Sequence, residues 1–163
     1  MRACQSKDPD RVLTEVRVYK GLPDHRSGID AQRYAARQTA SWAKTPGVAV
    51  RSRPLDYYEA EKRGRTVWKG QEKGVDVMLA LDLVEMARTG AFDTAVVFSD
   101  DSDLLPALEQ VVEIGKRVET ATWEGPGVNR GPIRIPDRDL WNHRLNQTDF
   151  NRVRDDTDYL AVP

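Results

Sequence analysis

Apolar and polar positions follow two periods along this chain, one typical of strands and one typical of helices. Period-two alternation or a short apolar run predicts strands at 12–19, 48–53, 65–68, 94–98, 117–123 and 158–162. Spacing by three or four, or a longer apolar stretch, predicts helices at 30–44, 75–88 and 103–114, and a short helix within 140–157. Residues 56–65 and 124–139 are polar or rich in glycine and proline, so we expect loops there. Strands that alternate with helices predict an α/β fold, with a mainly parallel sheet and helices on both faces.

Three aspartates follow the apolar run at 94–98. They are Asp100, Asp101 and Asp103, and in a parallel sheet the functional site lies beyond the carboxyl ends of the strands. Capping of the next helix explains one carboxylate at most, and the other charges remain without a partner. Because Mg²⁺ and Mn²⁺ prefer oxygen ligands, the alternative to capping is a divalent cation held by these side chains.

A second acidic feature lies at the start of the predicted helix 75–88. Asp76 falls in its first turn and Asp82 follows six residues later, so the two side chains are about 120° apart around the helix and need not share a ligand. For Asp76 the alternative interpretation is capping, as expected for Asp30 at the start of helix 30–44. Asp82 either faces solvent or supports the site from behind.

Charge is distributed unevenly along the chain, although the net charge is only −1. Residues 51–73 hold seven basic and four acidic side chains, whereas residues 74–109 hold one basic and eight acidic ones. This pattern is typical of a metal site beside a surface that binds a polyanion, and the alternative is charges that cluster on solvated faces. Arg65, Lys69 and Lys73 approach Asp76 along the chain, with Trp68 between the first two, and are candidates for contacts with the phosphates of such a polyanion.

Several classes of protein are disfavoured by the composition. One cysteine excludes a disulfide framework and fits a reducing cytoplasm, and two distant histidines disfavour a zinc site. No apolar run reaches the roughly 18 residues of a membrane span, so we expect no membrane partner. Neither a phosphate-binding glycine loop nor a serine nucleophile with a nearby histidine is found. A carboxylate–metal site that hydrolyses a phosphodiester remains.

The acidic segments resemble those of the NYN domain, a PIN-like family of the LabA/limkain-type nuclease superfamily. The resemblance lies in Lys73–Ala80, Asp82, Ala95–Pro106 and Gly115–Val118. It implies one Rossmann-like PIN/NYN domain over residues 1–163 and a ribonuclease that depends on Mg²⁺ or Mn²⁺. By position in the motifs, it implies that Asp76, Asp101 and Asp103 bind the metal.

Other motif positions carry further implications and one departure. Asp82 matches a later acid of the motif and would join the catalytic group, and Ser99 matches the serine before the acids and would lie against RNA. Asp100 occupies a position that is usually glycine, which adds a negative charge.

The resemblance also implies a first strand ending in an aspartate, which nothing in residues 1–30 matches. On this interpretation residues 12–19 form the second strand of the family, and the predicted sheet has an open central position. The alternatives are a missing upstream segment, a strand from a second subunit in a homo-oligomer, or a short variant that binds RNA without cleaving it. A small-molecule phosphohydrolase is the third class, and the absence of its aspartyl nucleophile motif disfavours it.

Overall fold

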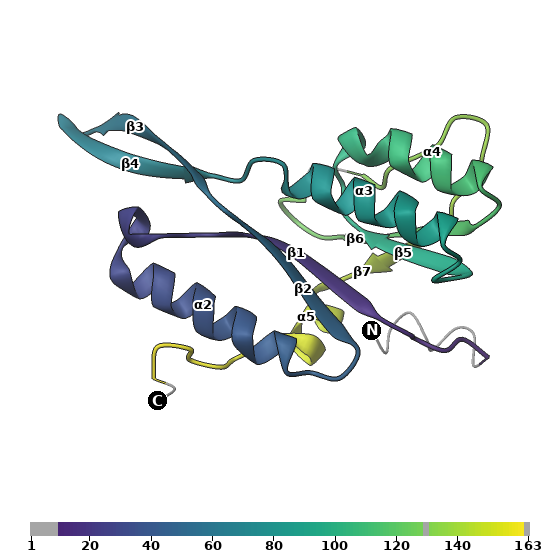
Figure 1. Ribbon diagram of the computed structural model, residues 1–163, viewed down its shortest axis with the longest axis horizontal. Helices are drawn as coiled ribbons and strands as arrows, with labels where there is room; N and C mark the ends of the chain where they lie inside the picture. Colours follow the sequence, from purple (N-terminus) through teal and green to yellow (C-terminus); the bar gives the residue numbers. More distant parts are fainter. Residues whose placement is uncertain (1–9, 129–130, 162–163) are drawn as a thin grey trace. The chain divides into compact units, whose positions relative to one another are not determined.

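The computed structural model describes residues 10–128 and 131–161 (Figure 1). The chain forms two compact units, one made of Leu79–Asp155 with the residues up to Leu13, and the other of Thr14–Met78 with the residues from Asp156. Each unit combines parallel strands with helices, which confirms the α/β class. Among the described residues, no helix is both long enough and apolar enough to cross a membrane.

The unit that starts at Thr14 contains the first predicted strand–helix–strand segment. Strands β1 (Val16–Leu22) and β2 (Val48–Pro54) pair in parallel, and helix α2 (Ile29–Ala43) connects them after a short 3₁₀ helix, η1 (His25–Ser27). The prediction is confirmed, although β1 starts later than expected. Asp30 is not the N-cap: Gly28 occupies that position with φ of +98°, and Asp30 lies in the first turn, where its charge suits the helix dipole.

A β-hairpin follows β2, where the sequence predicts mostly loop. Strands β3 (Asp56–Lys62) and β4 (Arg65–Gln71) pair antiparallel over all seven residues of each. Arg63 and Gly64 form the turn, with φ of +53° and +70°, as two-residue hairpin turns require. The loop prediction for 56–62 is wrong. Both faces of the hairpin are largely exposed, so its strands do not need an apolar residue at every second position, and the sequence lacks the alternation that would have predicted a strand.

The unit that contains Leu79–Asp155 is built on a three-stranded parallel sheet of order β5-β6-β7. Its elements, in chain order, are most of α3 (Val75–Arg88), β5 (Thr94–Phe98), η2 (Ser102–Leu104), α4 (Leu105–Glu113), β6 (Arg117–Trp123), β7 (Asn142–Leu145) and α5 (Gln147–Val153). The predicted helices and the strands at 94–98 and 117–123 are confirmed. Strand β7 was not predicted.

Helices α3 and α4 pack on one face of this sheet. Their core consists of Leu83, Ala87, Leu104, Leu108 and Val111 from the helices, with Val97, Val118, Ile133 and Ile135 from the strands and a loop. Strand β5 is therefore buried on one face only, because Val96 and Phe98 of the opposite face remain 41% and 52% exposed. Phe98 contacts Trp123, and Trp123 contacts Phe150 of α5, in edge-to-face pairs.

Buried charge lies on the other face of the same sheet. Glu119 of β6 is 7% exposed and accepts hydrogen bonds from both terminal nitrogens of Arg11, at 2.7 and 2.6 Å. Nε2 of His143, which is 5% exposed in β7, lies 2.7 Å from the same carboxylate. This cluster links the segment before β1 to two strands of the sheet.

The predicted strand at the end of the chain is not formed in the described residues, which stop at 161. Asp158 instead caps a turn by accepting the N–H of Leu160 at 2.9 Å. Tyr159 packs edge-to-face on Tyr34 of α2, and Arg37 donates to the carbonyl of Leu160 at 2.9 Å. These contacts attach the segment to α2 rather than to a sheet.

The hydrogen-bonded strands form three separate sheets rather than the single sheet that was predicted. Within the described residues, β1 pairs only with β2 and β5 pairs only with β6. The fold is therefore α/β, with two parallel sheets and one antiparallel hairpin.

Candidate metal centre

Asp101 and Asp103 lie in the turn between β5 and α4. The hydroxyl oxygen of Ser99 accepts the N–H of Asp101 at 3.1 Å, and Oδ1 of Asp101 accepts the N–H of Asp103 at 3.1 Å. Asp101 has an extended backbone and is the N-cap of η2. The capping interpretation is therefore correct for Oδ1 of Asp101. The cap fixes the orientation of this side chain and does not exclude that the carboxylate also binds a metal.

Asp76 comes from the first turn of α3. Gly74 has φ of +72°, a left-handed conformation that favours glycine, and its carbonyl accepts the N–H of Met78 at 3.1 Å, which closes the first turn. Further along the same helix, Leu83 and Ala87 pack in a core with Leu104 and Leu108. Because α3 is continuous, its packing carries Asp76 to the turn that follows β5.

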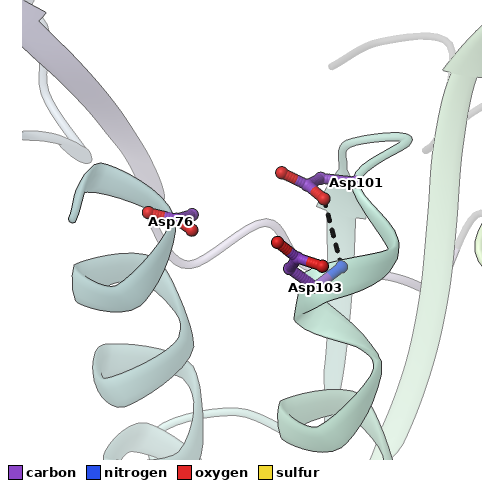
Figure 2. Close-up of side chains that lie close together, drawn as sticks. All are labelled: Asp76, Asp101 and Asp103. Atoms are coloured by element: carbon purple, nitrogen blue, oxygen red, sulfur yellow. Dashed lines mark hydrogen bonds between the residues drawn. The ribbon is translucent and has the colours of Figure 1, made fainter. Parts of the chain in front are cut away.

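The three carboxylates meet. Asp76, Asp101 and Asp103 each offer one oxygen, and these atoms lie within 4.8 Å of one another (Figure 2). Figure 2 shows Asp76 on α3 facing the other two side chains across a short gap. Three negative charges at this separation repel one another, and a divalent cation with oxygen ligands relieves that repulsion. The donor set fits Mg²⁺ or Mn²⁺, whose ligands are carboxylate oxygens and water.

Two acids from the sequence motifs are outside this group. Asp82 is half-buried on α3 and is not among the three residues that gather, because six residues turn it away from Asp76 around the helix. Asp100 is exposed, and its carboxylate is not one of the three either. The helical geometry expected for Asp82 is thus confirmed, and its catalytic role stays a prediction.

An open depression lies beside the acids. It is lined by Asp100, Asp101, Ser102, Asp103, Leu105 and the loop residues Gly131–Arg134. Arg134 is exposed and brings a cation to this depression. Arg134 was not predicted as a site residue, although the sequence held one signal for it. Its glycine- and proline-rich loop follows β6, the strand beside β5, so both loops lie at the same edge of the sheet.

The basic residues predicted to bind RNA occupy different settings. Arg65 and Lys69 are exposed on β4 of the hairpin. Lys73 follows β4, is exposed and forms an ion pair with Asp56 at 3.5 Å. Ser99 uses its hydroxyl to hold the backbone of Asp101, so its established contact is within the turn rather than with a ligand.

A sequence model of the NYN domain matches residues 1–130. The chain belongs to the NYN domain family. Its match includes both acidic segments and the hairpin, and it ends before β7. No curated protein and no solved structure matches the chain. NYN domains are a nuclease-like, RNA-related family that is typically metal-dependent, and the acidic group of this NYN domain lies within the matched residues.

Proposed function

We propose that this NYN domain is an endoribonuclease with a Rossmann-like, PIN-type arrangement, and that it hydrolyses RNA phosphodiesters with Mg²⁺ or Mn²⁺. The observation that carries the proposal is the meeting of Asp76, Asp101 and Asp103, whose oxygens lie within 4.8 Å of one another although they come from two separate segments. Membership of the NYN family adds a nuclease-like expectation to that geometry.

The proposed roles follow from where the side chains lie. Asp76, Asp101 and Asp103 hold the metal, and Ser99 keeps the turn of Asp101 in position through its hydrogen bond. When bound, the metal activates water and stabilises negative charge on the phosphate. Arg134 in the neighbouring depression is positioned to contact a phosphate, since guanidinium groups bind phosphate oxygens in pairs.

The test is cleavage of a labelled single-stranded RNA by the purified chain, with Mn²⁺, with Mg²⁺ and with excess chelator. A circular RNA of the same sequence is included because it has no ends, so only internal cleavage opens it. We expect metal-dependent cleavage of both RNAs. Cleavage of the linear RNA alone contradicts the endonuclease assignment, and binding without any cleavage points to the non-catalytic RNA-binding alternative.

A further inference from the structure

The β3–β4 hairpin separates its side chains into two different faces. Successive residues of a strand point to opposite faces, and residues directly opposite in the pair share a face. The pairs Tyr58↔Lys69, Ala60↔Val67 and Lys62↔Arg65 therefore form one face, which we call the basic face. The pairs Tyr57↔Gly70, Glu59↔Trp68 and Glu61↔Thr66 form the other, which we call the acidic face. All three strand cations between Tyr57 and Gly70 are on the first, and both glutamates are on the second.

The basic face is open to solvent. Lys62, Arg65 and Lys69 are exposed, Tyr58 is 48% exposed, and the side chains of the three cations form no ion pair within the described residues. Lys62 and Arg65 stand directly opposite each other beside Arg63 in the turn. Like charges in that position repel, so the hairpin tip is a place where an anion is stabilised.

The acidic face, in contrast, contacts the 3₁₀ helix η1 of the same unit. The guanidinium of Arg26 in η1 lies 4.2 Å from the ring centre of Tyr57 and 5.7 Å from that of Trp68. The hydroxyl of Tyr57 accepts the N–H of Asp24 at 2.8 Å and lies 2.7 Å from the hydroxyl of Ser27. These contacts fix the hairpin on η1 through the acidic face, and they leave the basic face free for a partner.

We propose that the basic face binds single-stranded RNA, with phosphates on Lys62, Arg65 and Lys69 and one unstacked base on the ring of Tyr58. This inference rests on the proposed function for the choice of RNA as the polyanion. Charge complementarity favours a nucleic-acid backbone. A single exposed ring among cations is the arrangement on which an unpaired base stacks, and a duplex offers no such base.

The test compares two triple variants of the full chain, measured in chelator so that RNA stays intact. The first replaces Lys62, Arg65 and Lys69 by glutamine. The control replaces three other exposed cations by glutamine, so that the net charge changes equally. They are Arg33 of α2, Lys44 at the end of α2 and Arg88 in the last turn of α3. Fluorescence anisotropy of a labelled single-stranded RNA gives the affinity, and circular dichroism confirms that each variant is folded.

We expect the hairpin variant to bind RNA about 10- to 100-fold more weakly at 0.1 M salt, with the slope of log K against log salt reduced by about 2, because each phosphate contact on a single strand contributes roughly 0.7. The control variant should bind almost as the unmodified chain does. Equal affinity of the two triple variants contradicts the proposal.

A single substitution tests the stacking separately. Tyr58→Ala should weaken binding of single-stranded RNA by about 5-fold or more, and Tyr58→Phe, which keeps the ring, should restore it. An equal effect of Tyr58→Ala on duplex RNA, or no rescue by phenylalanine, overturns the assignment of a base to this ring.

The outcomes also separate this inference from the proposed function. A chain that cleaves RNA but binds it equally well without the basic face retains the ribonuclease proposal and loses the hairpin one. A chain that never cleaves, yet loses RNA affinity in the hairpin variant, does the reverse. Absence of RNA binding by the unmodified chain contradicts the hairpin proposal directly.

Discussion

Replacing Asp101 by asparagine is expected to lower the rate of metal-dependent RNA cleavage by about 1,000-fold while the chain stays folded. Stabilisation by a bound metal is worth several kcal/mol in the transition state, and each factor of ten corresponds to about 1.4 kcal/mol. The amide oxygen of asparagine still accepts the N–H of Asp103, which Asp101 accepts at 3.1 Å. The cap of η2 therefore survives, and the negative charge needed for the metal is lost.

The chain offers a matched control next to this residue. Asp100→Asn removes the same charge one position away, from a carboxylate outside the group of three. Single-turnover cleavage with Mn²⁺ should therefore fall far less in Asp100→Asn than in Asp101→Asn. Similar losses in both variants would mean that overall charge in this turn, rather than ligation by Asp101, controls activity.

Replacing Glu119 by glutamine is expected to lower the free energy of unfolding at neutral pH by about 2–3 kcal/mol. Glu119 accepts two hydrogen bonds from Arg11 and lies 2.7 Å from Nε2 of His143. Losing one partner of a fully buried ion pair costs about 3–5 kcal/mol. The value here is smaller because the side chain of Arg11 is 32% exposed and water screens it.

The same carboxylate gives a pH dependence with a defined sign. Hydrogen bonds from Arg11, followed by that with His143, lower the pKa of Glu119 from its usual 4.5 against the opposing effect of burial. Because the pKa of Glu119 is lower in the folded than in the unfolded chain, the ionised carboxylate stabilises the fold at pH values above about 4.5. This stabilisation is lost as the pH falls below that value and the carboxylate is protonated. Urea unfolding at several pH values should show this acid loss in the unmodified chain and a weaker one in Glu119→Gln.

Glu85→Gln serves as the control for that series, because Glu85 is an exposed carboxylate on α3. It should leave the free energy of unfolding within about 0.5 kcal/mol, as surface substitutions usually do. Equal stability of the Glu119 and Glu85 variants at neutral pH would contradict the role assigned to the Arg11–Glu119–His143 cluster.

The parts of the fold that the sequence predicts best are those where burial imposes a period. Helix α3 and strand β5 bury side chains in one core, so their apolar residues are spaced by the geometry of the element. The acidic turn after β5 was predictable for a related reason. An apolar strand followed directly by charged residues indicates where the strand leaves the core, at the edge of the sheet. The resemblance to the NYN domain implied that Asp76, Asp101 and Asp103 act together, and their carboxylates are found together in the structure.

The parts that were missed depend on contacts that a local pattern does not carry. The hairpin is exposed, so its first strand lacks an apolar alternation, and only residues 65–68 of its second strand were predicted, which β4 confirms. Strand β7 is short and is formed by pairing with β6. Residues 158–161 have the composition of a strand, but the hydrogen bonds of Asp158 and Arg37 hold them as a turn on α2.

Arg134 was missed for another reason, because a loop has no period and its position is set by the sheet that precedes it. Asp101 and Asp103 were found because they stand with Asp100 in a segment of four residues that holds three aspartates. A single arginine in a long loop becomes noticeable only when the neighbouring strands β5 and β6 bring the two loops to one edge.

The central claim is that carboxylates from two separate segments hold one divalent cation, and Mn²⁺ binding tests it most directly. Electron paramagnetic resonance measures free Mn²⁺ during titration of the unmodified chain, of Asp76→Asn and of Glu85→Gln, the last changing an exposed acid on the same helix α3. We predict that the unmodified chain and Glu85→Gln bind Mn²⁺ with the same affinity, and that Asp76→Asn binds it at least about 10-fold more weakly. Unchanged affinity in a folded Asp76→Asn protein would show that Asp76 does not share an ion with Asp101 and Asp103.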